Sequence, residues 1–285
     1  MSAVQHLWQS ILNFIFYYPL FMSYLWMIGA LFFYWKERKD PPYTQPKPLD
    51  DYPLVAVLVP CFNEQDNAVE TISHALMLNY PNFEVIAIND GSSDNTAEIL
   101  NDLALKHDKL RVVHLAENQG KAMALQAGSL LTDAEFLIGI DGDALLDPYA
   151  AQWMIRHFQA NPSVAAVTGN PRIRTRSTLL GRIQVGEFSS IVGMIKRAQS
   201  TFGRLFTVSG VITAFRKSAV HEVGYWSPNM LTEDIDVTWK LHRAGWEVRF
   251  EPNALVWILM PETLNGLWKQ RLRWAMGGAQ VLIKN

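Results

Sequence analysis

The sequence predicts an α/β fold in which one N-terminal transmembrane helix precedes a domain with a mostly parallel sheet. Three observations lead to this prediction. An apolar segment without charged side chains opens the chain, short β-branched segments alternate with helical segments about every 30 residues, and acidic motifs follow the predicted strands. The composition agrees, because 18% of the residues are charged and soluble domains average about 25%.

The charge balance and the cysteine count exclude two further classes of protein. The net charge is −2, so no broad basic surface is expected and nucleic acid is not a predicted partner. Cys61 is the only cysteine. A disulfide within the chain is therefore impossible, which fits a reducing compartment.

The apolar segment covers residues 7–34 and contains no Lys, Arg, Asp or Glu. About 20 such residues cross a bilayer as a helix, so we predict one transmembrane helix, with Pro19 as a candidate kink. Lys36, Arg38 and Lys39 follow directly. Positive residues favour the cytoplasmic side, so the bulk of the chain is expected to be cytoplasmic. The alternative is a buried helix of a soluble protein.

An extended linker and then a regular alternation follow this helix. The linker, residues 36–53, is rich in proline: Pro41, Pro42, Pro46, Pro48 and Pro53. Short apolar strands are predicted at 54–59, 85–88, 112–115, 136–140 and 164–167. Helices are predicted at 65–78, 94–106, 121–131, 148–159, after Thr232, and at 262–285. This alternation is typical of βαβ units with right-handed crossovers.

Residues 170–216 are basic and contain a single acid, Glu187. The basic side chains noted here are Arg172, Arg174, Arg176, Arg182, Lys196, Arg197 and Arg204. Two interpretations stay open. The segment is either a surface facing solvent or lipid headgroups, or it contacts phosphate or acceptor near an active site.

Acidic side chains follow three of the predicted strands. They are Glu64, Asp90, Asp141 and Asp143. The carboxyl ends of parallel strands meet at one edge of a sheet, where ligands bind, and so many acids there would repel one another without a cation. Asp141-Gly142-Asp143 offers hard oxygen ligands suited to Mg²⁺ or Mn²⁺. The G-x-G-x-x-G and G-x-x-x-x-G-K-[ST] motifs are absent, so a metal rather than a glycine-rich loop is expected to hold a diphosphate.

Three other motifs each allow a functional and a structural interpretation. Asn118-Gln119-Gly120-Lys121 precedes a helix and suits an anion, or is an ordinary cap with an exposed lysine. Thr232-Glu233-Asp234 opens a helix and supplies a general base, or only a cap and acids for the helix dipole. Asp236 and Lys240, which follow in the same predicted helix at a spacing of four residues, are not a further motif and are expected to form only a surface pair.

The last of these motifs, Gln270-Arg271-Leu272-Arg273-Trp274, lies on the final predicted helix. Gln270, Arg273 and Trp274 share a face at spacings of three and four residues. They form either an interfacial helix with an aromatic anchor, or a group that contacts diphosphate through Arg273 and an acceptor sugar through Trp274.

Five motifs in order over residues 59–274 carry a family resemblance: V-P-C-F-N-E, N-D-G-S-S-D, D-G-D, T-E-D and Q-R-L-R-W. Together they resemble the processive family 2 glycosyltransferases, which include cellulose, chitin, hyaluronan and poly-N-acetylglucosamine synthases. The stretches 167–177, 206–211 and 257–263 closely resemble bacterial poly-β-1,6-N-acetyl-D-glucosamine synthases. The T-E-D form departs from the Gly-Glu-Asp or Gly-Asp-Asp of hyaluronan and nodulation chitin-oligosaccharide synthases.

The resemblance implies a glycosyltransferase A-type fold and inverting transfer from UDP-N-acetylglucosamine to a growing polysaccharide of a biofilm matrix. It implies Asp234 as the catalytic base, with Glu233 beside it, and Mg²⁺ or Mn²⁺ on Asp143 and Asp141. The residues expected to bind the nucleotide-sugar are Pro60, Glu64, Asp90, Lys121 and Asp141. Those expected at the acceptor and diphosphate are Gln270, Arg273 and Trp274.

The resemblance also predicts the setting of the enzyme. The predicted divisions are a transmembrane helix at 1–35, a linker at 36–53, a cytoplasmic catalytic domain at 54–260 and an amphipathic interface helix at 261–285. The expected location is the bacterial inner membrane, with the lipid bilayer and a small membrane subunit as partners. Family synthases continue with further transmembrane helices, so the chain resembles a truncated synthase, from which secretion alone is not expected.

Three alternatives stay open. The chain could make another β-linked polysaccharide of the chitin, hyaluronan or glucan type, or add a single sugar to a lipid carrier. From a different class, it could be a non-catalytic membrane scaffold or nucleotide sensor. The scaffold would be expected to have lost acids of the D-x-D or T-E-D motifs, and all of them are present.

Overall fold

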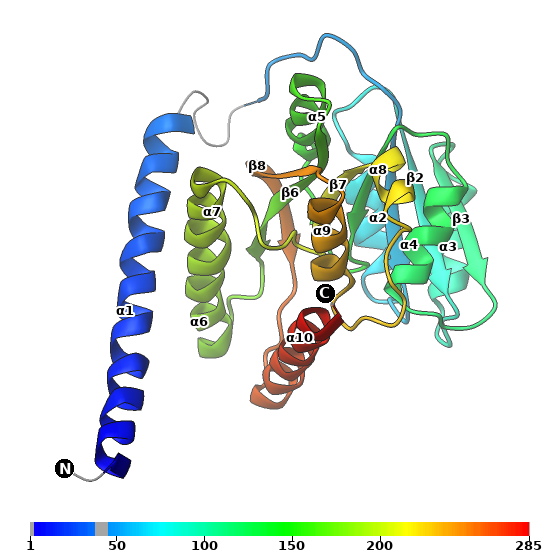
Figure 1. Ribbon diagram of the computed structural model, residues 1–285. Helices are drawn as coiled ribbons and strands as arrows, with labels where there is room; N and C mark the ends of the chain where they lie inside the picture. The colour runs from blue at the N-terminus through cyan, green and yellow to red at the C-terminus, as the bar shows by residue number, and fades with distance from the viewer. Residues whose placement is uncertain (1–2, 38–44, 285) are drawn as a thin grey trace.

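The computed structural model describes residues 3–37 and 45–284, which form one mixed sheet flanked by helices (Figure 1). The strand order is β3-β2-β1-β4-β7-β6-β8-β5. The strands are β1 Val55–Cys61, β2 Phe83–Asp90, β3 Leu110–Leu115, β4 Phe136–Ile140, β5 Leu145–Leu146, β6 Val164–Ile173, β7 Ile212–Arg216 and β8 Glu247–Ile258. The helices are α1 Ala3–Glu37, α2 Ala68–Leu76, α3 Thr96–Ala104, α4 Lys121–Leu130, α5 Ala150–Ala160, α6 Leu179–Phe188, η1 Ser189–Ile195, α7 Lys196–Phe202, α8 Lys217–Glu222, α9 Glu233–Arg243 and α10 Leu264–Lys284.

The first half of the sheet confirms the predicted α/β pattern. Strands β3, β2, β1 and β4 pair in parallel, and helices α2, α3 and α4 connect them. The side chains of β1 from Val55 to Val59 are fully buried. A strand that is covered on both faces is apolar at every position. The sequence therefore shows this strand as a continuous apolar run, without alternating polar and apolar residues.

The second half of the sheet contains strands that the sequence analysis missed. Strand β7 runs antiparallel between β4 and β6, and β8 pairs with β6 in parallel and with β5 antiparallel. Polar residues interrupt β8, and one of them, Glu251, is buried and bonded to His157 at 2.8 Å. An apolar pattern cannot identify a strand whose polar side chains are satisfied by distant partners.

Helix α1 stands beside the domain and packs on α7 (Figure 1). Val4–Lys36 is the one helix in the described ranges whose length and composition allow it to cross a membrane. A Cβ on Gly29 would lie 2.6 Å from the Phe202 ring and 2.7 Å from the Ala198 Cβ, so the absence of a side chain permits this contact. The helix continues through Pro19. Arg38, Lys39, Pro41 and Pro42 lie outside the described residues.

The basic segment forms the end of β6, a helical run from α6 through η1 to α7, and β7. Several of its cations bind protein groups. Arg174 pairs with Glu70 at 2.8 Å and Arg216 with Glu135 at 2.9 Å. The segment is therefore not simply a solvated surface.

Candidate active site

The turns that follow β1 and β2 are bonded to one another. Asn63 adopts φ 55°, its amide donates to Ser92 Oγ at 3.0 Å, and its Oδ1 accepts from the Ser93 amide at 2.9 Å. The Glu64 amide donates to Thr96 Oγ1 at 2.8 Å. These bonds hold the carboxyl edge of the sheet in a fixed shape.

Asp90, expected to bind the nucleotide-sugar, is buried at the end of β2 and organises the next turn. Its two carboxylate oxygens accept from the backbone amides of Gln119, at 2.8 Å, and Gly120, at 2.9 Å. Gly91 has φ +64°, and a Cβ there would lie 2.4 Å from the Glu117 carbonyl carbon. Asp90 thus fixes the turn that leads into α4, and its contact with the nucleotide-sugar stays a prediction.

The D-G-D motif lies against the turn after β1. A Cβ on Gly142 would lie 2.9 Å from the Pro60 carbonyl oxygen and 3.0 Å from Glu64 Cγ, so only glycine fits. Burial, with the charges of Asp141 and Glu64, raises the pKa of Asp143 to about 6. The structure therefore brings Pro60, Glu64, Asp141 and Asp143 together, as the position of the strand ends predicts.

A divalent cation fits the chemistry of this edge. Asp141 and Asp143 supply hard carboxylate oxygens, and a cation would relieve the charge that Asp143 shares with its neighbours. Within residues 3–37 and 45–284, no group of three or more His, Cys, Asp or Glu side chains could hold a metal by itself. Oxygens of a bound diphosphate would have to complete the ligand set.

Lys121 connects the D-G-D edge to the T-E-D helix. Its ammonium bonds Asp141, donates to the Gly210 carbonyl at 2.8 Å and lies 3.7 Å from the Glu233 carboxylate. Burial by itself would lower the pKa of Lys121, but Asp141 and Glu233 raise it above the ordinary value. The alternative of an exposed capping lysine is therefore wrong. Lys121 is a cation held among acids.

Asp234 and Glu233 begin α9 close to this lysine. Asp234 is half-buried, and its Oδ2 accepts from the Gly210 amide at 3.1 Å. Burial raises the pKa of Glu233, while the charge of Lys121 opposes that shift. Thr232 occupies the N-cap position but makes no side-chain capping bond. The simple capping interpretation of this motif therefore does not hold for Thr232.

The prediction that Asp236 and Lys240 form only a surface pair is wrong. Asp236 is fully buried rather than part of a surface pair, and Lys240 lies 3.7 Å from it. Ser227 Oγ donates to it at 2.6 Å and Lys284 Nζ at 2.8 Å. Burial would raise the pKa of Asp236, but these hydrogen bonds lower it.

The Q-R-L-R-W residues of α10 divide between two neighbours. Arg273 is exposed and donates to the Leu231 carbonyl at 3.3 Å, next to the T-E-D motif. Trp274 lies 6.5 Å from the ring of Phe188 on α6, measured between centroids. The Oε1 atom of Gln270 is buried, with no partner among the described residues. The structure therefore brings Arg273 to the residue that precedes the T-E-D motif, and the roles assigned to the three residues stay predictions.

A family model described as "Glycosyltransferase like family 2" matches residues 53–277 of this chain. The chain belongs to glycosyltransferase family 2.

Curated relatives of this family 2 glycosyltransferase include two from staphylococci. The chain is 46% identical over 279 residues to the poly-β-1,6-N-acetyl-D-glucosamine synthase of Staphylococcus epidermidis, covering 96% of the chain and 67% of the relative. It is 46% identical over 276 residues to the synthase of the same name from Staphylococcus aureus strain MSSA476, covering 96% and 66%. The chain thus spans about two thirds of their length.

Solved structures establish the glycosyltransferase A-type fold. The mannosyltransferase PcManGT from Pyrobaculum calidifontis, in complex with GDP-Man and Mn²⁺, matches with a TM-score of 0.68 at 22% identity, over 93% of this chain and 74% of that one. Staphylococcus aureus TarS 1–349, in complex with UDP, matches with a TM-score of 0.55 at 16% identity, over 72% and 60%. The predicted fold class is confirmed.

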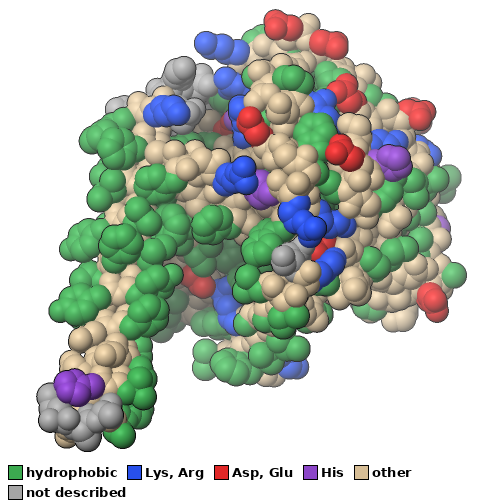
Figure 2. Space-filling view, in the orientation of Figure 1, with side chains coloured by type: hydrophobic (Ala, Val, Ile, Leu, Met, Phe, Trp, Pro, Cys, Tyr) green, Lys and Arg blue, Asp and Glu red, His purple; other side chains and the backbone are tan. Residues whose placement is uncertain are grey.

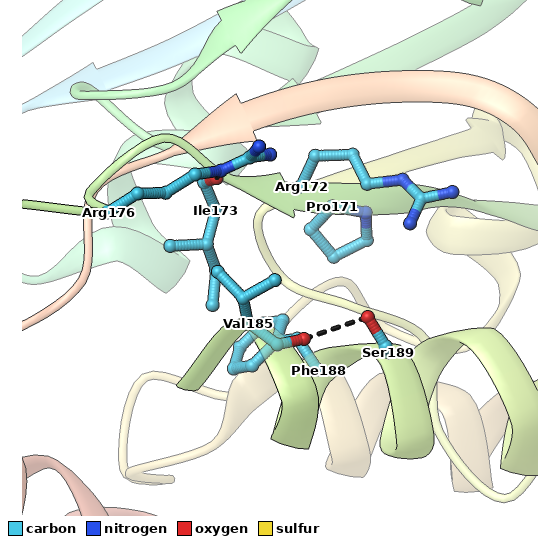
Figure 3. Close-up of a pocket in the computed structure, with 7 residues that line it drawn as sticks. All are labelled: Pro171, Arg172, Ile173, Arg176, Val185, Phe188 and Ser189. Carbon is cyan, nitrogen blue, oxygen red and sulfur yellow. Dashed lines mark hydrogen bonds between the residues drawn. The ribbon is translucent and has the colours of Figure 1, made fainter. Parts of the chain in front are cut away.

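The family 2 transferase also has a small cavity of about 40 Å³ between the end of β6 and α6 (Figure 3). Its lining includes Arg172 and Arg176 from the basic segment, together with Phe188 and Ser189. Ser189 Oγ donates to the Val185 carbonyl at 2.8 Å. The ring of Phe188 also lies near that of Trp274, so the basic segment borders the Q-R-L-R-W helix, and a contact with phosphate or acceptor stays a prediction.

Two residues of the site were missed by the sequence analysis. Gly210 was noted only within a resemblance, yet its carbonyl bonds Lys121 and its amide bonds Asp234. Lys196 was named only among the cations of the basic segment, yet it is buried and donates to the Thr207 carbonyl at 2.7 Å. The only available signal for Gly210 was a single glycine outside the predicted strands and helices, which is too common to be decisive.

Proposed function

We propose that this glycosyltransferase polymerises N-acetylglucosamine from UDP-N-acetylglucosamine into poly-β-1,6-N-acetyl-D-glucosamine of a biofilm matrix. The observation that carries the proposal is the position of Asp234 beside Gly210 and Lys121, across from the D-G-D carboxylates. The name of the staphylococcal relatives supports the sugar and the linkage.

In the proposed reaction Asp234 removes the proton from the 6-hydroxyl of the terminal acceptor sugar. That oxygen attacks the anomeric carbon from the face opposite the leaving UDP, so an α-linked donor gives a β-linked product. One base is enough because no covalent glycosyl-enzyme intermediate forms. Positioning and charge stabilisation then provide most of the rate.

The other residues of the edge hold the donor in this proposal. Asp141 and Asp143 would hold Mg²⁺ or Mn²⁺, which neutralises charge on the diphosphate when bound. Pro60, Glu64 and Asp90 shape the donor site. Arg273 contacts the diphosphate, and Gln270 with Trp274 contact the acceptor end.

The membrane setting is part of the proposal. Helix α1 would cross the bacterial inner membrane with the catalytic domain on the cytoplasmic side. Helix α10 would lie on the membrane surface, because Leu264, Trp268, Leu272 and Met276 are exposed at four-residue intervals. Hydrophobic side chains cover α1 and gather around α10 in Figure 2. A small membrane subunit is a further proposed partner.

A transfer assay on membranes that contain the chain tests the function. The assay supplies labelled UDP-N-acetylglucosamine and Mg²⁺ or Mn²⁺, beside UDP-glucose and a sample with chelator. The expected result is release of UDP with β-1,6-linked polymer. Activity with UDP-glucose alone would move the assignment to a glucan synthase, and a single added sugar on a lipid would indicate a non-processive transferase. UDP binding without any turnover would favour the sensor alternative.

A further inference from the structure

The catalytic helix α9 and the Q-R-L-R-W helix α10 are joined through an ion pair between the buried carboxylate of Asp236 and the exposed Lys284. Asp236, in the first turn of α9, is 0% exposed. Lys284, in the last turn of α10, donates to Asp236 Oδ1 at 2.8 Å and to Ser227 Oγ at 3.1 Å. Ser227 Oγ in turn donates to the other carboxylate oxygen of Asp236 at 2.6 Å. A buried carboxylate with a donor on each oxygen has one preferred position.

A second contact between the helices requires a glycine. A Cβ on Gly277 would lie 2.4 Å from Thr232 Cγ2 and 2.5 Å from Thr232 Oγ1. Thr232 directly precedes Glu233 and Asp234. The neighbouring Gly278 has no atom within 4 Å of its Cβ position. The backbone of α10 therefore approaches the T-E-D turn at Gly277 and not at the next residue.

The two contacts and the motif lie on the same side of α10. Gln270, Trp274, Gly277, Val281 and Lys284 follow one another at spacings of four, three, four and three residues, so they form one stripe along the helix. Gly277 and Val281 are the buried residues of α10. A shift or rotation of α10 that breaks the contacts at Gly277 and Lys284 therefore also moves Gln270 and Trp274.

We propose that the Asp236–Lys284 ion pair and the Gly277–Thr232 contact together position the base Asp234 relative to the Q-R-L-R-W face of α10. The contacts are made by Thr232 and Asp236, on either side of Asp234. A small displacement of reacting groups is costly to transfer, because the base and the acceptor hydroxyl must lie within hydrogen-bond reach. This inference rests on the proposed function for its kinetic consequence.

A matched pair of substitutions, made in the whole chain described here and assayed in membranes, tests the Gly277 contact. Alanine raises helix propensity at both glycines, so propensity does not explain a loss at one of them. We expect Gly277→Ala to lower kcat by about tenfold or more with the donor KM within about twofold, and to raise the share of donor hydrolysed without transfer. Gly278→Ala should keep the wild-type values. Equal kinetics in the two variants would overturn the proposal.

Lys284 gives an independent test. We expect Lys284→Met to lower kcat and Lys284→Arg to retain most of it, while Lys269→Met, an exposed change on the same helix, has no effect. The double variant Asp236→Asn/Lys284→Met should lose less than the two single losses combined, because the paired groups are coupled. If Lys284→Met loses UDP binding and helix content together with activity, the pair is only structural and the proposal fails.

Amide hydrogen exchange separates this inference from the proposed function. In Lys284→Met the amides of residues 231–236 should exchange at least about tenfold faster, because the α9–α10 contact opens more often. Unchanged exchange would overturn the contact as a constraint, whatever the activity. A wild-type protein with this protection but no transfer to any acceptor would instead overturn the proposed function.

Discussion

The ammonium of Lys121 lies 3.7 Å from the carboxylate of Glu233, although the two residues belong to different helices, α4 and α9. The same ammonium bonds Asp141 of the D-G-D motif and the Gly210 carbonyl. One cation thus joins the expected metal edge to Glu233, the neighbour of the expected base Asp234. It screens the mutual repulsion of acids that would otherwise separate the two motifs.

Substitution of Lys121 by methionine should therefore lower sugar transfer by about 100-fold, since a preorganised charge at a site typically contributes this much. Steady-state transfer with saturating donor measures the effect. Lys106→Met is the matched control, because the Lys106 side chain is exposed and its backbone amide, which the change keeps, bonds the Leu103 carbonyl at 3.0 Å. Full activity in Lys121→Met would show that the lysine has no part in catalysis.

Asp234→Asn should abolish transfer and leave UDP binding largely intact. The amide cannot accept the acceptor proton, and loss of a general base costs about 100- to 10,000-fold. Asn still offers an oxygen to the Gly210 amide, so the turn should keep its shape. Calorimetric titration with UDP checks binding, and a transfer assay checks catalysis. Polymer made at the normal rate would refute the assignment.

Asp143→Asn should raise the metal concentration needed for half-maximal activity by at least about tenfold, since even changes around metal ligands cost that much. The measurement is a titration of activity with Mn²⁺ after chelation. Asp133→Asn serves as the control because Asp133 is exposed. An unchanged titration curve in Asp143→Asn would remove this residue from the metal site.

Cys61 should be unreactive in the folded protein. Burial, with the charge of Glu64, raises the pKa of its thiol to about 12, and the thiolate is the reactive form. A maleimide at neutral pH is expected to label the chain only after denaturation. Because the chain has one cysteine, mass spectrometry of the whole protein reads the result directly. Rapid labelling under native conditions would contradict the buried position.

Lys196 should make stability depend on pH in the alkaline range. Burial lowers the pKa of Lys196 from 10.5 to about 8, and the charge of Asp234 opposes this shift. Between these values the unfolded chain binds more protons, so the free energy of unfolding rises with pH, by up to about 1.4 kcal/mol per pH unit. Below pH 8 the full cost of the buried charge is present.

Denaturant unfolding of wild type and Lys196→Met between pH 7.5 and about 10 checks this slope. The difference in unfolding free energy between the two should move in favour of wild type as the pH rises. Lys106→Met again serves as the control. Parallel curves for wild type and Lys196→Met would mean that Lys196 keeps an ordinary pKa.

The sequence by itself determined the parallel half of the sheet and the edge where the acids meet. Each βαβ unit is local, so apolar strands such as Val55–Cys61 and the motifs that end them can be identified from neighbouring residues. The parallel direction of these strands then brings Glu64, Asp90, Asp141 and Asp143 to one edge without further information. The apolar helix α1 could also be identified from its own residues alone.

Only the tertiary structure decided what the polar side chains bind. Strand β7 pairs between β4 and β6, and Lys121, Gly210 and Asp236 find partners far along the chain, which no periodicity encodes. Asp236 shows the reason. Its four-residue spacing to Lys240 predicted a surface pair. The Asp236 carboxylate is buried instead, and a buried charge is stable only when hydrogen-bond donors compensate for the lost water. Lys284 and Ser227 are those donors. Local patterns predict the elements, and packing between distant elements determines the site.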